Sequence, residues 1–365
     1  MSRVEDEKWM RMCLTLAAKG AGYVSPNPLV GAVIVFNGKV LGKGYHRKFG
    51  DSHAEVNAIK NARVRYPNLR GATLFVNLEP CVHYGKTPPC VNAIVDEGIV
   101  KVVAAMSDPN PLVAGKGFDY LRTAGVKVVA GVLESEAGKL NEKFIKYIST
   151  GVPFVALKVA QTSDGFIAKK DGTSKWISTV ASRKVVHTLR SEYDAVLIGR
   201  GTAALDNPKL TVRSVRGRNP FRVLIDGKLR TPVEAAMFND KDRSRTIVFF
   251  GAAKTEKARI LQAKGVQLIP MKSRKGIISI PEILTVLAGK GIVSLLVEGG
   301  QSIYQQFLKA RAVDKIYLFI SPKKFGEGLL AFGGMRKSFR IKREGIRNTD
   351  GDIFIEGRLS YAKTQ

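Results

Sequence analysis

The sequence predicts an α/β protein built from two domains, and three observations lead to that expectation. The chain has 365 residues and a mass of 39.8 kDa, more than one domain usually holds. Apolar residues make up 45% of it, enough for real hydrophobic cores. Apolar runs typical of strands alternate with helical patterns. A break at Ser149-Thr-Gly-Val-Pro153 lies between the two halves, so we expect domains over 1–150 and 151–365.

In the first half, the apolar pattern gives each element in turn. Trp9, Met12, Cys13 and Leu16 share one face of the first expected helix. Asn37-Gly38 is typical of a hairpin turn between two strands. The patterns predict helices over 5–19, 53–65, 88–97, 117–124 and 134–148, and strands over 30–35, 40–45, 72–77, 100–105 and 126–130.

The second half repeats this alternation, and its late strands lie close enough in sequence to pair antiparallel. The expected strands are 154–160, 195–199, 222–225, 246–250, 266–269, 294–297, 315–320 and 352–357. The expected helices are 180–191, 255–264, 281–289 and 301–309. We therefore expect a second layered α/β domain.

The charge is the unusual part of the composition. Lys and Arg number 59 against 31 Asp and Glu, which gives +28 at pH 7 and a pI near 10.1, and most of the excess lies beyond residue 150. Such an excess is compatible with nucleic acid, with anionic small molecules or with a basic solvated surface. The only dense cluster is the short run Lys241 to Arg245, and no basic tail is present. This pattern weakens the nucleic-acid interpretation.

The sequence has no evident targeting signal, and we expect a cytoplasmic protein. The first eight residues mix acids and bases and lead into no apolar segment, so we expect no signal peptide. No apolar run approaches the roughly 18 residues that a membrane span needs. Three cysteines in so long a chain do not form a disulfide framework, which favours a reducing compartment.

One histidine and two cysteines in the first half have the pattern of a catalytic zinc site. His53-Ala54-Glu55 opens an expected helix, Cys81 follows Glu79-Pro80, and Cys90 comes nine positions later. One imidazole and two thiolates leave the fourth position of a tetrahedral zinc open, where the ion lowers the pKa of water to about 7. In zinc deaminases the matching glutamate carries protons. Glu55 takes that place here.

The simpler interpretation is that His-x-Glu arises by chance and that two cysteines are only small buried apolar groups. The combination argues against it, although eight residues separate the two thiols where Cys-x-x-Cys is usual. Helices beginning after Glu79-Pro80 and near Pro89-Cys90 would direct backbone N–H groups to the metal and keep the thiols ionised. Cys13, on the apolar face of the first helix, is expected in the core.

Polar residues in neighbouring loops suggest a pocket for a phosphorylated base. Each of them alone is more simply a loop residue, but together they supply amides, imidazoles and a cation. They are Asn27, His46, His83, Lys86 and Asn110.

In the second half, Glu298-Gly299-Gly300 lies between a strand and a helix, where a phosphate can approach backbone N–H groups. The run Gly199 to Ala204 nominally matches a dinucleotide fingerprint, with Asp226 as a ribose-binding acid. We discount that match, because Asp206-Asn207-Pro208 would stop the required helix within two turns.

These segments resemble one known family, the bifunctional deaminase–reductases of riboflavin biosynthesis. The segments that carry the resemblance in the first half are Asn27–Gly31, His53–Glu55, Glu79–Cys90 and Asp108–Pro111. A looser but collinear match in the second half runs through Ser163–Gly165, Asp206–Arg213 and Glu298–Gly300. Together these segments cover nearly the whole chain.

The resemblance implies two reactions on one pathway. The first domain, similar to cytidine deaminases, would remove the 2-amino group of 2,5-diamino-6-(5-phosphoribosylamino)pyrimidin-4(3H)-one by hydrolysis. The second, similar in fold to dihydrofolate reductase, would use NADPH to reduce the ribosyl side chain of 5-amino-6-(5-phosphoribosylamino)uracil to ribityl. We find no lost motif residue in either half and expect both to be active.

The resemblance also implies roles for single residues. Zinc would be held by His53, Cys81 and Cys90, with Glu55 as the proton carrier. The NADP contacts would be Ala160, Trp176, Thr202, Asp206, Gly300, Gln301 and Ser302. The substrate contacts in the second domain would be Ser174, Arg190, Leu210, Arg213 and Glu298. Lys158 or Asp206 would assist proton movement in the reduction, and the sequence does not decide between them.

Two other classes of function stay open at this point. A nucleic-acid deaminase would use the basic second half to hold RNA, but aromatic and basic residues are not interleaved. A binding protein with a structural zinc would need a fourth protein ligand, and only three are evident beside Glu55. We expect the phosphorylated pyrimidine and NADPH as small-molecule partners, no membrane partner, and a homo-oligomer.

Overall fold

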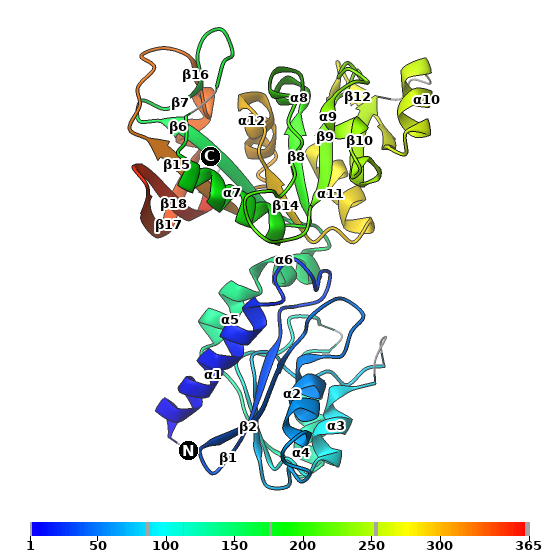
Figure 1. Cartoon of the computed structure of the whole chain (residues 1–365), viewed down its shortest axis with the longest axis vertical. Coiled ribbons are helices and arrows are strands. Elements are labelled where there is room, and N and C mark those ends of the chain that lie inside the picture. Colours follow the sequence, from blue (N-terminus) through cyan, green and yellow to red (C-terminus); the bar gives the residue numbers. More distant parts are fainter. Residues whose placement is uncertain (1, 85–87, 112, 175–176, 252–254, 362–365) are drawn as a thin grey trace. The chain divides into compact units, whose positions relative to one another are not determined.

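The computed structural model describes residues 2–84, 88–111, 113–174, 177–251 and 255–361. Over these residues the chain divides into two compact units, Met1–Gly151 and Val152–Gln365 (Figure 1). Strands and helices alternate in both units, which confirms the predicted α/β class. Among the residues described, no helix is long and apolar enough to cross a membrane.

The first unit is built on one mixed sheet. Its strands are β1 (Gly31–Phe36), β2 (Lys39–Tyr45), β3 (Thr73–Val76), β4 (Lys101–Ala104) and β5 (Lys127–Val129). Their order across the sheet is β2-β1-β3-β4-β5, in which β1 runs antiparallel to both neighbours and β3, β4 and β5 are parallel. The carboxyl ends of β3 and β4 therefore meet at one edge, where the loops that carry the site begin.

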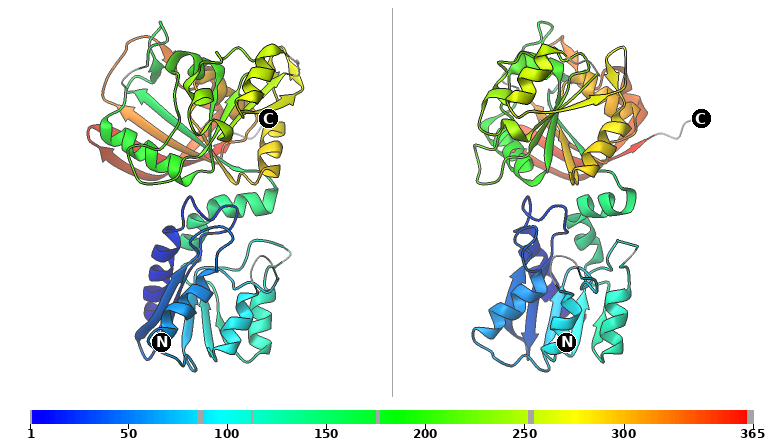
Figure 2. Two further views of the ribbon diagram at one scale, coloured as in Figure 1. Left: turned by 45° about the vertical axis from the view of Figure 1, so that its right-hand side comes forward. Right: turned by 90° about the vertical axis from the view of Figure 1, so that its right-hand side faces the viewer.

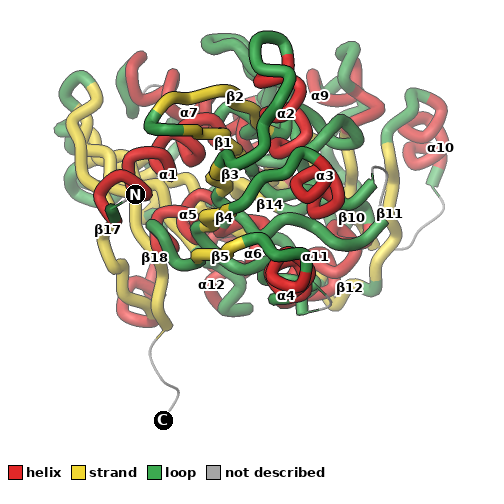
Figure 3. Tube along the Cα trace, turned by 90° about the horizontal axis from the view of Figure 1, so that it is seen from below, coloured by secondary structure: helices red, strands yellow, loops and turns green. Residues whose placement is uncertain are grey.

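Helices cover both faces of this sheet (Figure 3). They are α1 (Arg3–Ala18), α2 (Ala54–Arg63), α3 (Cys90–Asp96), α4 (Lys116–Thr123), α5 (Glu134–Leu140) and α6 (Glu142–Thr150). One core lies between the sheet and α2, α3 and α4, and a second between the sheet and α1 and α5. Cys13 is fully buried in the second core, as predicted, and its thiol donates to the carbonyl of Phe75.

The helix predicted over 134–148 is wrong in one respect, because the chain forms two helices, α5 and α6. The break is at Asn141, whose side chain is occupied elsewhere. Its Oδ1 accepts from Leu29 N at 2.8 Å and its Nδ2 donates to Leu29 O at 3.0 Å. This amide is held by a distant loop at the residue where α5 ends and α6 begins.

The second unit contains a sheet of nine strands. Their order is β11-β10-β9-β8-β14-β6-β15-β18-β17, parallel except where β18 joins β15 and β17. The bounds are β6 (Phe154–Thr162), β8 (Ala195–Gly199), β9 (Phe221–Ile225), β10 (Thr246–Gly251), β11 (Gln267–Met271), β14 (Ser294–Val297), β15 (Lys315–Ser321), β17 (Phe339–Thr349) and β18 (Asp352–Tyr361). Two small pairs lie beside it, β7 (Phe166–Ala168) with β16 (Leu329–Leu330) and β12 (Ser273–Arg274) with β13 (Ile277–Ile278).

Helices again pack on both faces. They are α7 (Val180–Glu192), α8 (Arg200–Asp206), α9 (Ala236–Asn239), α10 (Glu256–Ala263), α11 (Ile280–Gly289) and α12 (Gln301–Lys309), with 3-10 turns at Arg243–Arg245 and Gly333–Ser338. One core lies under α11 and α12, and the other under α7, α9 and α10. The predicted antiparallel pairing of the late strands is confirmed, but β17 was not predicted (Figure 2, red).

Candidate functional site

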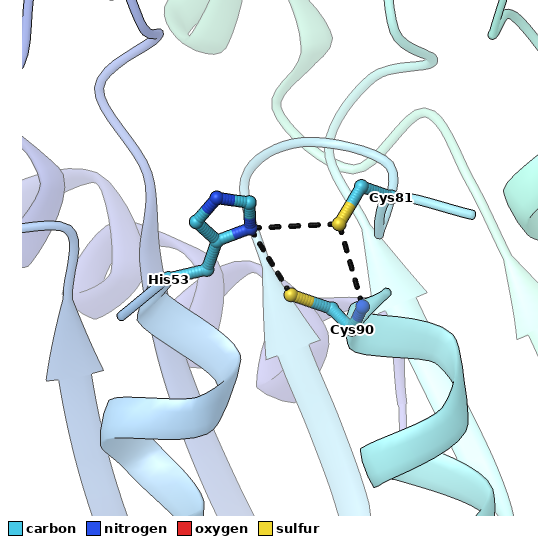
Figure 4. Close-up of side chains that lie close together, drawn as sticks. All are labelled: His53, Cys81 and Cys90. Carbon is cyan, nitrogen blue, oxygen red and sulfur yellow. Dashed lines mark hydrogen bonds between the residues drawn. The ribbon is translucent and has the colours of Figure 1, made fainter. Parts of the chain in front are cut away.

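The three predicted zinc ligands lie together at the sheet edge of the first unit. His53 caps the N-terminus of α2, Cys81 lies in the loop after β3, and Cys90 is the first residue of α3. Their side chains point toward one another from these three elements (Figure 4). Nδ1 of His53 is 3.2 Å from Sγ of Cys90 and 3.5 Å from Sγ of Cys81.

The geometry and chemistry of this cluster fit zinc. All three ligand atoms lie within 4.8 Å of one another. Ligands on a tetrahedral zinc, with Zn–N near 2.0 Å and Zn–S near 2.3 Å, stand roughly 3.5 Å apart. Two sulfur atoms and one imidazole nitrogen form a soft donor set. Such a set binds zinc in preference to calcium or magnesium. Among the described residues this is the one such cluster, and it leaves one coordination position for a small molecule.

Local interactions prepare the two thiols for a cation. Hydrogen bonding to the Cys90 thiol, together with contact to His53, lowers the pKa of Cys81 to about 4. The same thiol contact and burial raise the pKa of Cys90. The backbone N–H of Cys90 donates to Sγ of Cys81 at 3.3 Å, as expected of a helix beginning there. The second expected helix start, after Glu79-Pro80, is wrong, because that segment is a loop.

Glu55 lies in the first turn of α2, two residues from His53, with only 3% of its surface exposed. Burial raises the pKa of Glu55 to about 7, and the nearby Cys81 charge adds to that effect. A carboxyl group with such a pKa can both accept and release a proton near neutrality.

The cluster opens into a pocket of about 350 Å³. Four predicted binding residues line it: Asn27, His46, His83 and Asn110. The fifth, Lys86, lies outside the described residues. Nδ2 of Asn27 is 3.1 Å from Nε2 of His46, and Nδ1 of His46 is 3.2 Å from Ser52 O. Burial lowers the pKa of His46, so a neutral ring donates at Nδ1 and accepts at Nε2.

The sequence did not indicate the opposite wall of this pocket. Phe144, Tyr147 and Ile148 of α6 line it, at the spacing of one helix face. The prediction treated 134–148 as one helix and had no reason to turn this face to the site. Asp108 also lines the pocket and was noted only as part of a loop.

A second pocket of about 470 Å³ lies in the other unit. Glu298, which follows β14, lines it with a side chain only 5% exposed. Arg190 of α7 donates to it from Nε at 2.6 Å and from Nη2 at 2.9 Å, and Nζ of Lys158 is 3.3 Å away. Burial alone would raise the pKa of Glu298, but the charges of Arg190 and Lys158 outweigh it and hold that pKa at about 2.

Every described residue predicted for the second site lines this pocket. The cofactor candidates are Ala160, Thr202, Asp206, Gly300, Gln301 and Ser302, and the substrate candidates are Ser174, Arg190, Leu210, Arg213 and Glu298. Trp176 lies outside the described residues. Lys158 and His187 line it too, and His187 was not predicted. Burial and the charges of Arg190 and Arg213 lower the pKa of His187 to about 4, so its ring is neutral.

The turn at Gly299 and Gly300 lies between a strand and a helix, as the sequence predicted. Gly300 caps α12, and a Cβ on Gly299 would lie 2.8 Å from Ile303, so a side chain there would collide with the helix. The discounted dinucleotide helix is short: α8 ends at Asp206, followed by Asn207 in the left-handed region. Asp226 does not line the pocket; its Oδ2 accepts from Thr231 N–H and O–H, both at 2.7 Å.

Two protein-family models match the chain. The model described as "Cytidine and deoxycytidylate deaminase zinc-binding region" matches residues 3–106. The model of the "RibD C-terminal domain" matches residues 153–355. The first match confirms the predicted cytidine-deaminase-like fold of the first unit.

Curated relatives and solved structures match over nearly the whole length. The chain is 43% identical to a riboflavin biosynthesis protein RibD of Aquifex aeolicus, covering 97% of this chain and 99% of the relative. It is 35% identical to the RibD protein of Escherichia coli, covering 96% and 99%. A crystal structure of a diaminohydroxyphosphoribosylaminopyrimidine deaminase/5-amino-6-(5-phosphoribosylamino)uracil reductase from Thermotoga maritima superposes with a TM-score of 0.89 at 40% identity, over 98% of this chain and 99% of that one. Acinetobacter baumannii RibD superposes with a TM-score of 0.88 at 34% identity, over 98% and 100%.

Proposed function

The chain belongs to the RibD family of riboflavin biosynthesis, and from that membership we propose which reaction each of its two pockets carries out. It is a bifunctional enzyme, a deaminase and a reductase, with zinc and NADPH as its cofactors. We assign deamination to residues 1–150 and reduction to residues 151–365. The observation that carries the first assignment is the His53, Cys81 and Cys90 cluster beside the buried Glu55.

In the first pocket, His53, Cys81 and Cys90 would hold zinc. Zinc bound there supplies a Lewis acid that brings the pKa of water near neutrality. Glu55 accepts a proton from the attacking water and passes protons to the ring nitrogen and to the departing amine, which leaves as ammonia. Its raised pKa suits both directions of transfer.

The remaining groups of this pocket would bind the phosphorylated diaminopyrimidine. Burial keeps the His46 ring neutral, and its contacts with Asn27 and Ser52 fix its pattern of donor and acceptor. Asn110 and His83 add further polar contacts, and Phe144 of α6 offers an apolar surface to the flat ring. Lys86 is the cation proposed for the phosphate.

In the second pocket, bound NADPH would supply a hydride for reduction of the sugar carbon in a ring-opened imine form of the substrate, and the chain would have to supply one proton to balance it. Thr202, Asp206 and the segment Gly300–Ser302 would bind the cofactor at the N-terminus of α12. Ser174, Arg190, Leu210, Arg213 and Glu298 would orient the phosphoribosyl chain.

Contacts in the second pocket favour Lys158 over Asp206 as the proton source. The Lys158 ammonium is 3.3 Å from Glu298 and reaches the pocket with its side chain only 17% exposed. Asp206 instead accepts from the Ser174 hydroxyl at 3.5 Å. An ammonium can donate a proton directly, whereas an ionised carboxylate cannot.

One assay tests the whole proposal. The purified chain is supplied with 2,5-diamino-6-(5-phosphoribosylamino)pyrimidin-4(3H)-one and NADPH, and ammonia and NADPH are followed together. We expect one ammonia released and one NADPH oxidised for each substrate molecule. Ammonia release without NADPH oxidation would overturn the assignment of the second pocket, and no ammonia would overturn that of the first.

Three further expectations, about location, oligomeric state and partners, are also proposals. The enzyme acts in the cytoplasm, forms a homo-oligomer and has small phosphorylated molecules rather than nucleic acid as its partners. Sedimentation of the purified chain tests the second. Binding to RNA with a steep salt dependence would contradict the third.

A further inference from the structure

The carboxylate of Glu79 accepts four backbone hydrogen bonds. Oε2 accepts from Asp108 N and Gly115 N, both at 3.0 Å. Oε1 accepts from Gly117 N at 2.8 Å and from Phe118 N at 3.3 Å. Only 3% of the residue is exposed, so these amides replace water around a buried charge.

These four amides belong to one part of the fold, the loop after β4 and the first turn of α4. The backbone of Glu79 adds a fifth bond, from its N–H to Met106 O at 3.0 Å. Gly117 approaches so closely that a Cβ there would lie 2.2 Å from Pro80 O. The segment of Glu79 and Pro80 is therefore locked against this loop and this helix, with no room for a side chain between them.

The locked segments lead directly to both sides of the deaminase pocket. Cys81, a proposed zinc ligand, follows Pro80 in sequence. On the other side, Asp108 and Asn110 line the pocket, and Asp108 Oδ1 accepts from Asn110 N at 2.8 Å. Glu79 also lines the pocket, but both oxygens of its carboxylate accept hydrogen bonds from the four backbone N–H groups.

We propose that Glu79 is a positioning residue of the deaminase, which sets the place of Asn110 and Asp108 relative to the thiol loop. This inference rests on the proposed function of the first pocket. Glu79 would act through the loop, because both of its carboxylate oxygens already accept backbone hydrogen bonds from that loop and from α4. A displaced Asn110 would weaken substrate binding more than it slows the chemistry that Glu55 carries out.

The role requires a carboxylate and not merely a side chain of that size. Four N–H groups point at its two oxygens, and an ionised carboxylate accepts at both. In a glutamine, one oxygen becomes an NH₂ group that faces two N–H donors. Those two donors lose their acceptor, and the loop must move to satisfy them.

The experiment compares Glu79→Gln with the wild type in steady-state deamination of the phosphorylated diaminopyrimidine. We expect KM to rise by about tenfold or more, the cost of two lost buried hydrogen bonds, with kcat changed by less than about threefold. Zinc content, measured by metal analysis, should stay at the wild-type value. NADPH oxidation with the deaminated substrate should be unchanged.

Asp6→Asn is the matched control. Asp6 is also a buried carboxylate of the first unit, 7% exposed, but it pairs with Lys101 at the start of β4 and not at its end. This variant should leave KM within about twofold of the wild type. A second test is the double variant with Asn110→Ala. Once Asn110 is absent, Glu79→Gln should raise KM by less than about threefold.

The outcomes separate the possible failures. If the wild type releases no ammonia, the proposed function is wrong, and this inference with it. If the wild type is active and Glu79→Gln leaves KM unchanged, or raises it equally with and without Asn110, Glu79 is not a positioning residue. If Glu79→Gln does not fold, Glu79→Asp takes its place, and an unchanged KM in that shorter variant overturns the inference equally.

Discussion

Arg190 and Glu298 form a two-point ion pair inside the second pocket, with Nε 2.6 Å from Oε1 and Nη2 2.9 Å from Oε2. Lys158 approaches the same carboxylate at 3.3 Å. Two cations therefore surround one acid, and the pocket keeps a net positive charge. Such a site suits an anionic substrate while holding Glu298 in a single orientation.

The pKa of Glu298 predicts how stability depends on pH. That pKa is about 2 in the folded chain, and an unfolded glutamate titrates near 4.3. The stabilising contribution is therefore present above about pH 4.3 and is lost as the pH falls toward 2. We expect Glu298→Gln to lower the free energy of unfolding of the second unit by about 3 kcal/mol at pH 7, with a smaller difference at pH 3. Urea unfolding at both pH values measures this. Glu256→Gln, at a residue whose side chain is 72% exposed, is the control and should show no difference at either pH.

Glu55→Gln should abolish deamination without harming the other pocket. Loss of the proton carrier should reduce ammonia release by about 10²–10⁴-fold. The variant should still bind zinc, because its three ligands are unchanged, and should still oxidise NADPH with the deaminated substrate. Ammonia release at the wild-type rate in a zinc-loaded variant would show that Glu55 is not the proton carrier.

Removal of zinc by a chelator should separate the two activities. Deamination should be lost and NADPH oxidation kept, since no described metal-ligand cluster lies in the second unit. The half-buried Cys81 should then react with a thiol reagent, while Cys13, fully buried against Phe75, should not. Added zinc should restore deamination and protect Cys81. Loss of reductase activity on chelation would contradict the assignment.

Arg222 is the charged residue on which the stability of the second unit should depend most. It is 1% exposed, pairs with Asp240 at 2.5 and 2.8 Å, and donates to the carbonyls of Met237 and Lys209. Arg222→Met leaves the half-buried Asp240 and two backbone carbonyls without their buried donor and should cost about 3 kcal/mol. Urea unfolding followed by circular dichroism checks this. Arg259→Met, at a side chain 81% exposed, should cost less than about 1 kcal/mol.

The sequence predicted most of the regular elements, and physical reasons explain which of them it missed. Buried strands such as β8 and β14 are continuous apolar runs, so their patterns are clear. The strand β17 carries exposed Arg340, Lys342 and Arg343, and its apolar alternation stops after Ile341, so it was missed. It is an edge strand, where cations discourage pairing with another sheet. Part of the unexplained positive charge lies there.

The candidate site also contains residues that the sequence could indicate and residues that it could not. His53, Cys81 and Cys90 could be found because zinc accepts few residue types, and their chemistry is visible in the sequence. The pocket residues on α6 could not be found from the sequence, because the start of α6 depends on Asn141 pairing with a loop more than a hundred residues away. Long-range contacts of this kind leave no periodic signal in the sequence.

Each pocket is lined, among the described residues, by its own unit alone, and one peptide chain carries both. The two activities are thus produced in a constant one-to-one ratio, whatever the level of expression. The same separation allows two damaged chains to complement each other. A chain with Glu55→Gln and a chain with Glu298→Gln, mixed in one vessel, should together convert the diamino substrate to the ribityl product, with the intermediate passing between them through solution.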